Sequence, residues 1–337
     1  MTDGVAPALD RIVIGIDFGA PSLAAAAWIA HALAPAGELM LVHVIGAPPP
    51  LSLGEPRPAP TEEAIHAARE VAGSRLRDVA ATLGDRPVRV EVRDGPPAPG
   101  IAAAAEAWGA DLVAVGPHEA RRPPWSAIGS TAEHLIRMSP IPVLLVTGSA
   151  SGPPRRLLVP VDDGDLSAAV LEWAGAIARC FGAGITLAHV IDARSGERRA
   201  PGLADASRSS ADATGDEPAA APPEVVAKEW LARLARELPG ARPAELAVSA
   251  GVPGEEVLAT ALRAGADLII MGRRGRGRVL PGEVGSTART VLRGASCPVL
   301  IVVDPADAIV GEWPAEAADA IAPPHDAEPW SARPPAA

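Results

Sequence analysis

The sequence predicts an α/β fold built from two doubly wound parallel five-stranded sheets packed as a pseudo-dimer. Three observations lead to this prediction. The chain has 337 residues, which is long enough for two domains. Its second half repeats the first. Within each copy, short apolar runs alternate with helical stretches, the pattern of parallel strands that are covered by helices on both faces.

The repeat is clearest where the two copies match at a constant offset of 156 positions. At this offset Gly109-Ala110-Asp111 matches Gly265-Ala266-Asp267, and Pro142-Val143-Leu144 matches Pro298-Val299-Leu300. Earlier positions match at a smaller offset, so the second copy carries an insertion, which we place within 194–223. We therefore expect domains at residues 8–148 and 154–304, a short Gly/Ser/Pro linker between them, and a disordered acidic, Pro/Ala-rich tail at 305–337.

The elements follow one another in the same order in both copies. In the first copy we expect strands at Arg11–Ile16, Leu39–Ile45, Pro87–Val92, Leu112–Val115 and Val143–Val146, with helices at Ser22–Leu33, Glu62–Leu83, Ala98–Trp108 and Thr131–Met138. In the second copy the strands are Leu157–Val161, Ile185–Ile191, Glu245–Ser249, Leu268–Met271 and Val299–Val303, and the helices are Leu166–Phe181, Pro223–Leu238, Glu255–Ala264 and Thr287–Leu292. The last strand of each copy is strongly apolar, so we expect the two to pair antiparallel and bury each other's edge.

The charge and the composition exclude several classes of protein. The net charge of −11 argues against binding to nucleic acid or to an anionic membrane surface. No apolar run reaches the ~18 residues of a membrane span, and the N-terminus lacks the pattern of a secretory signal, so we expect a cytoplasmic protein. Two cysteines cannot form a disulfide framework or a four-ligand zinc site, and no protein metal site is expected.

One motif carries the chemistry. Gly272-Arg273-Arg274-Gly275 is followed after nine residues by Gly285-Ser286-Thr287, so a glycine-rich turn at a strand end faces the start of a helix. Glycines allow backbone N–H groups to approach a phosphate closely, and a helix N-terminus adds unpaired donors and a favourable dipole. Four arginines, Arg273, Arg274, Arg276 and Arg278, add positive charge to the same loop. The motif therefore predicts a nucleotide site in the second half.

With these residues the chain resembles a tandem universal stress protein. The ATP-binding members of that family carry G-x2-G-x9-G-[ST], which Gly272, Gly275, Gly285 and Ser286 match at every spacing. The first strands end in Asp17 and Asp162, and the second strands end in His43-Val44 and His189-Val190, as is common in the family. The resemblance implies the adenine-nucleotide α-hydrolase-like fold for both halves, ATP as the cofactor, and a Mg²⁺ ion that bridges the phosphates.

The resemblance also assigns roles to residues. It implies that Asp162 contacts the adenosine and that Pro160 and Val190 line the adenine pocket. Met271 and Gly272 would flank the nucleotide, Arg274 and Gly275 would lie on the phosphates, and the other side would be closed by Gly285, Ser286 and Thr287.

The first copy departs from the motif. Glu119 replaces its second glycine and Pro117 removes a donor N–H, so we expect a degenerate and weaker site made by Asp17, Val44, Gly116, His118, Gly129, Ser130 and Thr131.

Three functions fit these observations. The first is an ATP-binding stress-response regulator or sensor, which acts through nucleotide-dependent interactions with unidentified protein partners. The second is an enzyme of the same fold, at most a weak ATPase or a nucleotidyl transferase, although no catalytic residue stands out around the loop. The third is a dimeric scaffold that binds no nucleotide. The sequence does not choose between ATP, ADP, AMP and a cyclic nucleotide, and it leaves a homodimer of the whole chain open.

Overall fold

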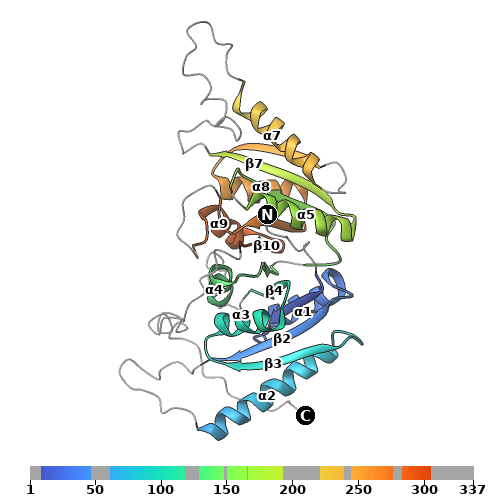
Figure 1. The fold of residues 1–337 in the computed structure, drawn as a ribbon, viewed down its shortest axis with the longest axis vertical. Helices are drawn as coiled ribbons and strands as arrows, with labels where there is room; N and C mark the ends of the chain where they lie inside the picture. The colour runs from blue at the N-terminus through green and yellow to red at the C-terminus, as the bar shows by residue number, and fades with distance from the viewer. Residues whose placement is uncertain are drawn as a thin grey trace, which may run out of the picture.

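The computed structural model describes residues 9–46, 61–117, 129–147, 150–164, 166–192, 221–238, 244–275 and 283–304. Together they form one ten-stranded sheet with helices on both faces (Figure 1). The loops expected at 47–61 and 194–223 lie almost entirely outside the described residues, and so does the tail at 305–337.

The predicted alternation of strands and helices is confirmed in both halves. The first half consists of β1 (Arg11–Gly15), α1 (Ala20–Trp28), η1 (Ile29–Leu33), β2 (Glu38–Ile45), α2 (Glu62–Ala81), β3 (Val88–Asp94), α3 (Pro97–Trp108), β4 (Leu112–Val115), α4 (Ser130–Met138) and β5 (Val143–Leu145). The second half consists of β6 (Arg156–Pro160), α5 (Ser167–Phe181), β7 (Gly184–Asp192), α7 (Pro223–Glu237), β8 (Glu245–Gly251), α8 (Pro253–Ala264), β9 (Leu268–Gly272), α9 (Ser286–Gly294) and β10 (Val299–Val302). The single long helix expected near the start is α1 continued by the π-helical turn η1.

The two half-sheets join edge to edge. The strand order is β3-β2-β1-β4-β5-β10-β9-β6-β7-β8, so each half runs outward from the junction in the same order. All neighbours within a half are parallel, whereas β5 and β10 pair antiparallel with Leu144 opposite Leu300. The expected antiparallel pairing of the last strands is therefore present, and it converts two sheets into one.

Two hydrophobic cores cover the two faces of this sheet. Successive strand residues point to opposite faces, so Ile12 and Ile14 of β1 belong to one core and Val13 to the other. The first core is closed by residues of α1, η1, α2, α5 and α7, and the second by residues of α3, α4, α8 and α9. Each core contains residues of both halves, so the junction is part of the folded core.

The repeated Gly-Ala-Asp motif has a structural role. Gly109 and Gly265 end α3 and α8 in the left-handed conformation, with φ of 67° and 57°, which glycine adopts without strain. Asp111 then accepts hydrogen bonds from the backbone N–H groups of Asp10 and Arg11. Asp267 makes the equivalent contacts in the second half. The motif thus fixes the start of the first strand of each half.

The junction gives a first testable prediction. Leu300 is 1% exposed at the centre of the β5–β10 pairing, and Leu300→Asp would bury an unpaired carboxylate there. The cost is several kcal/mol, comparable to the whole stability of a domain. We expect aggregation or a lower, broader thermal transition, measured by light scattering and calorimetry. Leu262→Asp is the matched control, because Leu262 is 71% exposed. A compact, monodisperse Leu300→Asp protein with unchanged melting would contradict the importance of this pairing.

Candidate functional site

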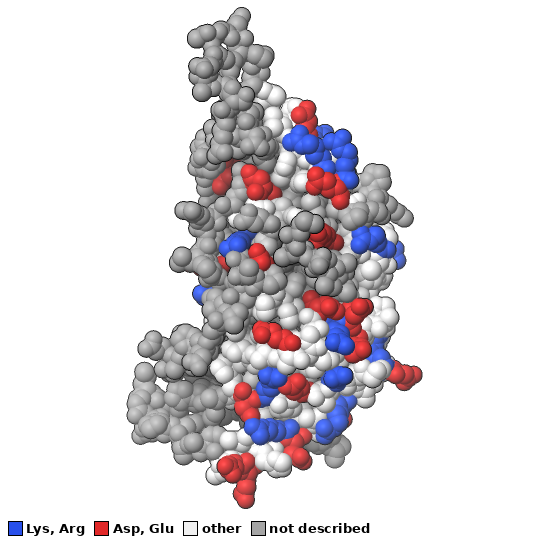
Figure 2. Space-filling model, in the orientation of Figure 1, with Lys and Arg blue, Asp and Glu red and all other residues white. Residues whose placement is uncertain are grey.

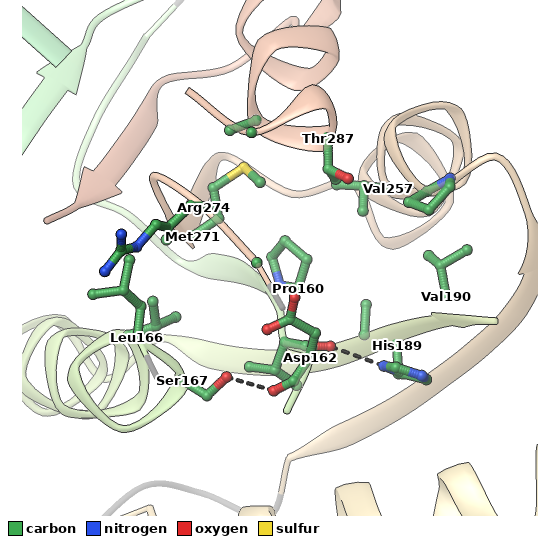
Figure 3. A pocket seen from close by; sticks show the side chains of 18 of the residues that line it. Pro160, Asp162, Leu166, Ser167, His189, Val190, Val257, Met271, Arg274 and Thr287 are labelled. Atoms are coloured by element: carbon green, nitrogen blue, oxygen red, sulfur yellow. Dashed lines mark hydrogen bonds between the residues drawn. The ribbon is translucent and has the colours of Figure 1, made fainter. Parts of the chain in front are cut away.

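A pocket opens in the second half where β6 and β9 separate. These strands pair only through Leu157 with Leu268 and Leu158 with Ile269. Two residues further along β6 lies Pro160, which has no backbone N–H to donate to a neighbouring strand. Beyond this point the structure holds a cavity of about 460 Å³ (Figure 3). It lies at the carboxyl ends of the strands, at the point where the strand order reverses, where ligands bind in open α/β sheets.

The structure brings all ten residues predicted for the second half around this one pocket. They come from β6 and the turn after it, from β7, from the end of β9 and from the first turn of α9: Pro160, Asp162, Val190, Met271, Gly272, Arg274, Gly275, Gly285, Ser286 and Thr287. The motif and the family resemblance thus predicted their common location. Their roles toward a ligand belong to the proposal below.

Asp162 and Gly275 lie against each other in the lining of the pocket. One carboxylate oxygen of Asp162, Oδ1, accepts a hydrogen bond of 2.9 Å from the N–H of Gly164. The other, Oδ2, would lie 2.1 Å from a Cβ atom built on Gly275. Ser167 at the start of α5 donates to the carbonyl oxygen of Asp162 (Figure 3). The glycine at position 275 therefore leaves room for this carboxylate.

The glycine-rich turn is held against the start of α9. The N–H of Gly285 donates to the carbonyl oxygen of Arg273 over 3.0 Å, which ties the two parts of the motif together. The first turn of α9 follows at Ser286, and Gly285 provides no side-chain cap for it. The early N–H groups of a helix have no partner within the helix, so this end can receive an anion. Arg274 extends along the rim toward Leu166 (Figure 3).

One of the predicted arginines does not serve this pocket. Arg273 is buried and does not line the cavity, and its guanidinium donates to carbonyl oxygens of α4 in the other half. The prediction that Arg273 adds positive charge for a phosphate is therefore wrong, because residue 273 points away from the pocket between two residues that line it. Arg276 and Arg278 lie outside the described residues.

Sequence reasoning missed three apolar residues of the pocket lining. Leu166 and Val170 come from the start of α5, where Leu166 lies beside Gly272, and Val257 comes from α8. Asp192 at the end of β7 adds a second carboxylate to the rim. These residues lie far from the glycine-rich motif in the sequence, and no pattern marks them as pocket residues. The nearest signal is Gly251-Val252-Pro253, which matches Gly95-Pro96-Pro97 of the first copy, since Pro253 also lines the pocket.

The histidines of the second strands are held by backbone hydrogen bonds at the edges of the two pockets, His189 buried and His43 half-buried. The Nδ1 atom of His189 is hydrogen-bonded to the carbonyl oxygen of Val161 over 2.9 Å, and its ring meets Trp230 edge-on at 5.2 Å. His43 makes the equivalent bond to Ile16 over 2.7 Å. Burial lowers the pKa of His43, although the bond to Ile16 opposes this change. His43 is therefore neutral at pH 7.

The equivalent pocket of the first half is smaller, about 220 Å³. Six of the seven residues predicted for this weaker site line it: Asp17, Val44, Gly116, Gly129, Ser130 and Thr131. His118 lies outside the described residues. The Oδ1 atom of Asp17 accepts from Ser22 Oγ at 2.6 Å and from the N–H of Gly19 at 2.8 Å, so it supports the start of α1.

Two lining positions carry larger side chains in the first half. Ile101 and Val42 stand where the second half has Val257 and Ala188. The Cδ1 atom of Ile101 fills the space beside Gly15, where a Cβ atom would lie only 2.8 Å from it. The β1–β4 pairing also continues through four residues, to Gly15. The strands therefore separate less in the first half than in the second.

Phe18 distinguishes the first half further. It adopts a left-handed backbone with φ of 64°, which is unusual for a bulky residue. Its ring lies 4.6 Å from that of His43, and the Arg75 guanidinium lies over it at 4.0 Å. The second half has Asp163 at the corresponding place. The two halves therefore differ beside the ring of His43 as well as in the volumes of their pockets.

Metal binding, thiol chemistry and membrane insertion can also be examined in the described part of the chain. These residues contain no group of three His, Cys, Asp or Glu side chains that could hold a metal ion. Cys297 is buried, which raises the pKa of its thiol to about 11, so it is protonated at pH 7. No described helix is both long enough and apolar enough to cross a membrane. On the face shown in Figure 2, acidic and basic side chains are interspersed.

Comparisons with known proteins agree with this architecture. A sequence profile of the universal stress protein family matches residues 8–147 and 154–303. A universal stress protein of Methanocaldococcus jannaschii is 28% identical over 152 residues, which cover 45% of this chain and 83% of the relative.

Solved structures give the same result for the fold. A universal stress protein from Archaeoglobus fulgidus is 22% identical, with a TM-score of 0.62, and the match covers 87% of this chain and 96% of that one. A functionally unknown protein from Pseudomonas aeruginosa is 18% identical, with a TM-score of 0.59 and coverage of 94% and 97%. Another universal stress protein, described as a complex with cAMP, is 22% identical and covers 44% of this chain and 96% of its own, with a TM-score of 0.30.

Proposed function

The chain belongs to the universal stress protein family, and on this basis we propose that its second half binds ATP and that the protein acts as a stress-response regulator through its nucleotide-bound state. The observation that carries the proposal is the pocket between β6 and β9, where all ten motif-derived residues meet. Its volume of about 460 Å³ is within the range of small-ligand and cofactor sites.

The chemistry of the pocket fits the parts of the nucleotide. The adenine would lie in the apolar part, between Pro160, Val190 and Val257. Asp162 would accept hydrogen bonds from the adenosine. The triphosphate would follow the glycine-rich turn to the N-terminus of α9, where backbone donors and the helix dipole favour negative charge. Mg²⁺ would be carried by the phosphates, since the described residues form no carboxylate cage.

A regulatory role is favoured over catalysis by the residues of this pocket. A transfer reaction needs a positioned base or nucleophile. In this pocket His189 is hydrogen-bonded through Nδ1 to the carbonyl oxygen of Val161, and Asp162 accepts through Oδ1 from the N–H of Gly164, so both support the local structure. A regulator of this kind would act in the cytoplasm, where ATP is available, and would contact its protein partners differently with and without nucleotide.

The test is the identity of the bound molecule. The protein is purified gently and denatured, and the released nucleotide is identified and quantified by mass spectrometry. We expect about one adenine nucleotide per chain, as befits one well-formed site. Calorimetric titration of the stripped protein with ATP, ADP, AMP and cAMP then ranks the four ligands, and ATP should bind most tightly.

Each competing function gives a different result. Stoichiometric conversion of ATP to ADP, faster than in a boiled control, would favour the weak ATPase. A protein that carries no nucleotide and ignores all four ligands would refute the proposal and favour a scaffold.

A further inference from the structure

Arg273 is a charged side chain buried at the junction of the two halves. It is only 1% exposed, although it lies in the glycine-rich turn of the second-half site. Its Nη1 atom donates to the carbonyl oxygens of Ile136 and Arg137, over 3.2 Å and 3.0 Å. Both carbonyls belong to the last turn of α4, in the first half. A guanidinium at a helix C-terminus satisfies carbonyls that have no helical partner and complements the helix dipole.

The backbone of Arg273 is fixed on the other side of the junction. Its N–H donates to the carbonyl oxygen of Val302 at the end of β10 over 2.9 Å, and its own carbonyl accepts from the N–H of Gly285. A single residue therefore connects the end of β10, the start of α9 and the end of α4. Its neighbours Gly272 and Arg274 both line the second-half pocket.

The far end of α4 lies at the other pocket. Gly129, Ser130, Thr131 and Ala132, at the N-terminus of α4, line the first-half cavity. The helix has nine residues, so it spans about 13 Å. Figure 1 shows α4 at the centre of the molecule, close to the junction. One short helix and one arginine side chain thus connect the two pockets.

The connection exists once, although the fold is repeated. The residue that corresponds to Arg273 in the first half is Pro117, which has neither a backbone N–H nor a side-chain donor. Pro117 therefore cannot make the equivalent bond to the end of α9. The two halves are similar in fold but unequal in this contact.

We propose that Arg273 is a positioning residue that couples the second-half nucleotide site to α4 and, through it, to the first-half pocket. The ligand-dependent part rests on the proposed function. Phosphates on the glycine-rich turn restrict the backbone of residues 272–275, and the guanidinium passes this restriction to α4. Because coupling is reciprocal, a molecule bound at the N-terminus of α4 changes affinity in the second pocket by the same factor.

Hydrogen exchange of the full-length chain, followed by mass spectrometry, tests this coupling. Without ligand, Arg273→Met should speed exchange in α4 by about tenfold, because the variant loses the hydrogen bonds from a charged donor to the end of this helix. With saturating ATP, the wild type should gain protection in both α9 and α4, whereas Arg273→Met should gain it in α9 alone. Arg273→Lys keeps a positive charge and N–H donors on a shorter side chain without the planar fork, and should fall between the two.

Arg293→Met is the matched control, because Arg293 is the exposed α9 residue that corresponds to Arg137. It should leave exchange in α4 unchanged. If Arg273→Met does not fold, Arg273→Lys makes the same comparison.

Two results would overturn the coupling: unchanged exchange in α4 of the ligand-free variant, or equal ATP protection of α4 with and without Arg273. A wild type in which ATP protects neither α9 nor α4 would refute ATP binding instead. The ligand-free comparison would then decide the role of Arg273 on its own.

Discussion

Gly275→Glu is expected to remove most ATP binding from the second half while the chain stays folded. Gly275 is exposed and its φ lies outside the left-handed region, so glutamate can adopt its backbone. A Cβ atom here would lie 2.1 Å from Oδ2 of Asp162, so that carboxylate must move. The new carboxylate would also face the phosphates. At about 4 Å and an effective dielectric of about 20, this repulsion costs about 4 kcal/mol.

The size of this effect makes the experiment decisive. Each 1.4 kcal/mol is about tenfold in affinity, so even half of the repulsion weakens binding roughly 30-fold. Gly275→Ala is the matched control, since it displaces Asp162 without adding charge and should weaken binding less. Calorimetric titration gives the affinities, and thermal unfolding in the absence of ATP shows that the fold is intact. Unchanged affinity in a folded Gly275→Glu protein would mean that this turn does not hold phosphate.

The second large effect is an asymmetry between the halves. Ser286 and Ser130 are exposed residues at the first positions of α9 and α4, and each lines its own pocket. Ser286→Asp should weaken ATP binding at least 30-fold, because the new carboxylate meets the phosphates. Ser130→Asp should weaken it much less, since the smaller first pocket does not carry the main site and the new charge can act on the second pocket only through α4. Aspartate is favourable at a helix N-terminus, so both variants should fold.

Titration of each full-length variant with ATP and Mg²⁺ measures this difference. The wild type should bind about one nucleotide per chain with high affinity. Equal losses from the two substitutions, or two equivalent sites in the wild type, would show that Glu119 does not weaken the first site. The first half would then be a complete site, contrary to our interpretation of its motif.

Most of the fold could be predicted because each element expected in one copy is also expected at the matching place in the other. Every apolar strand run recurs at a matching place, and the apolar last strands predict the junction between β5 and β10. The ten residues around the second pocket were found because the motif and the family resemblance place them at strand ends and at a helix start.

The remaining features depend on side-chain direction. Val257 and Leu166 line the pocket from helices, where no spacing marks them. Ile101 fills the first pocket only because β1 and β4 stay paired as far as Gly15. Arg273 has the same sequence context as Arg274, yet the two side chains serve different parts of the molecule. Residue type and order cannot distinguish these cases.

The edge-to-edge junction has a consequence for how the two halves can differ. In a homodimer with two-fold symmetry, both subunits share one sequence, so every interface residue occurs twice. A substitution that stabilises or destabilises the interface therefore acts on both sides of it. Here the same kind of interface lies within a single chain. Each side can then change independently, and assembly no longer depends on protein concentration. Arg273 in the second half and Pro117 at the corresponding place in the first are a difference that a symmetric homodimer cannot keep, so the two halves of this chain are free to diverge.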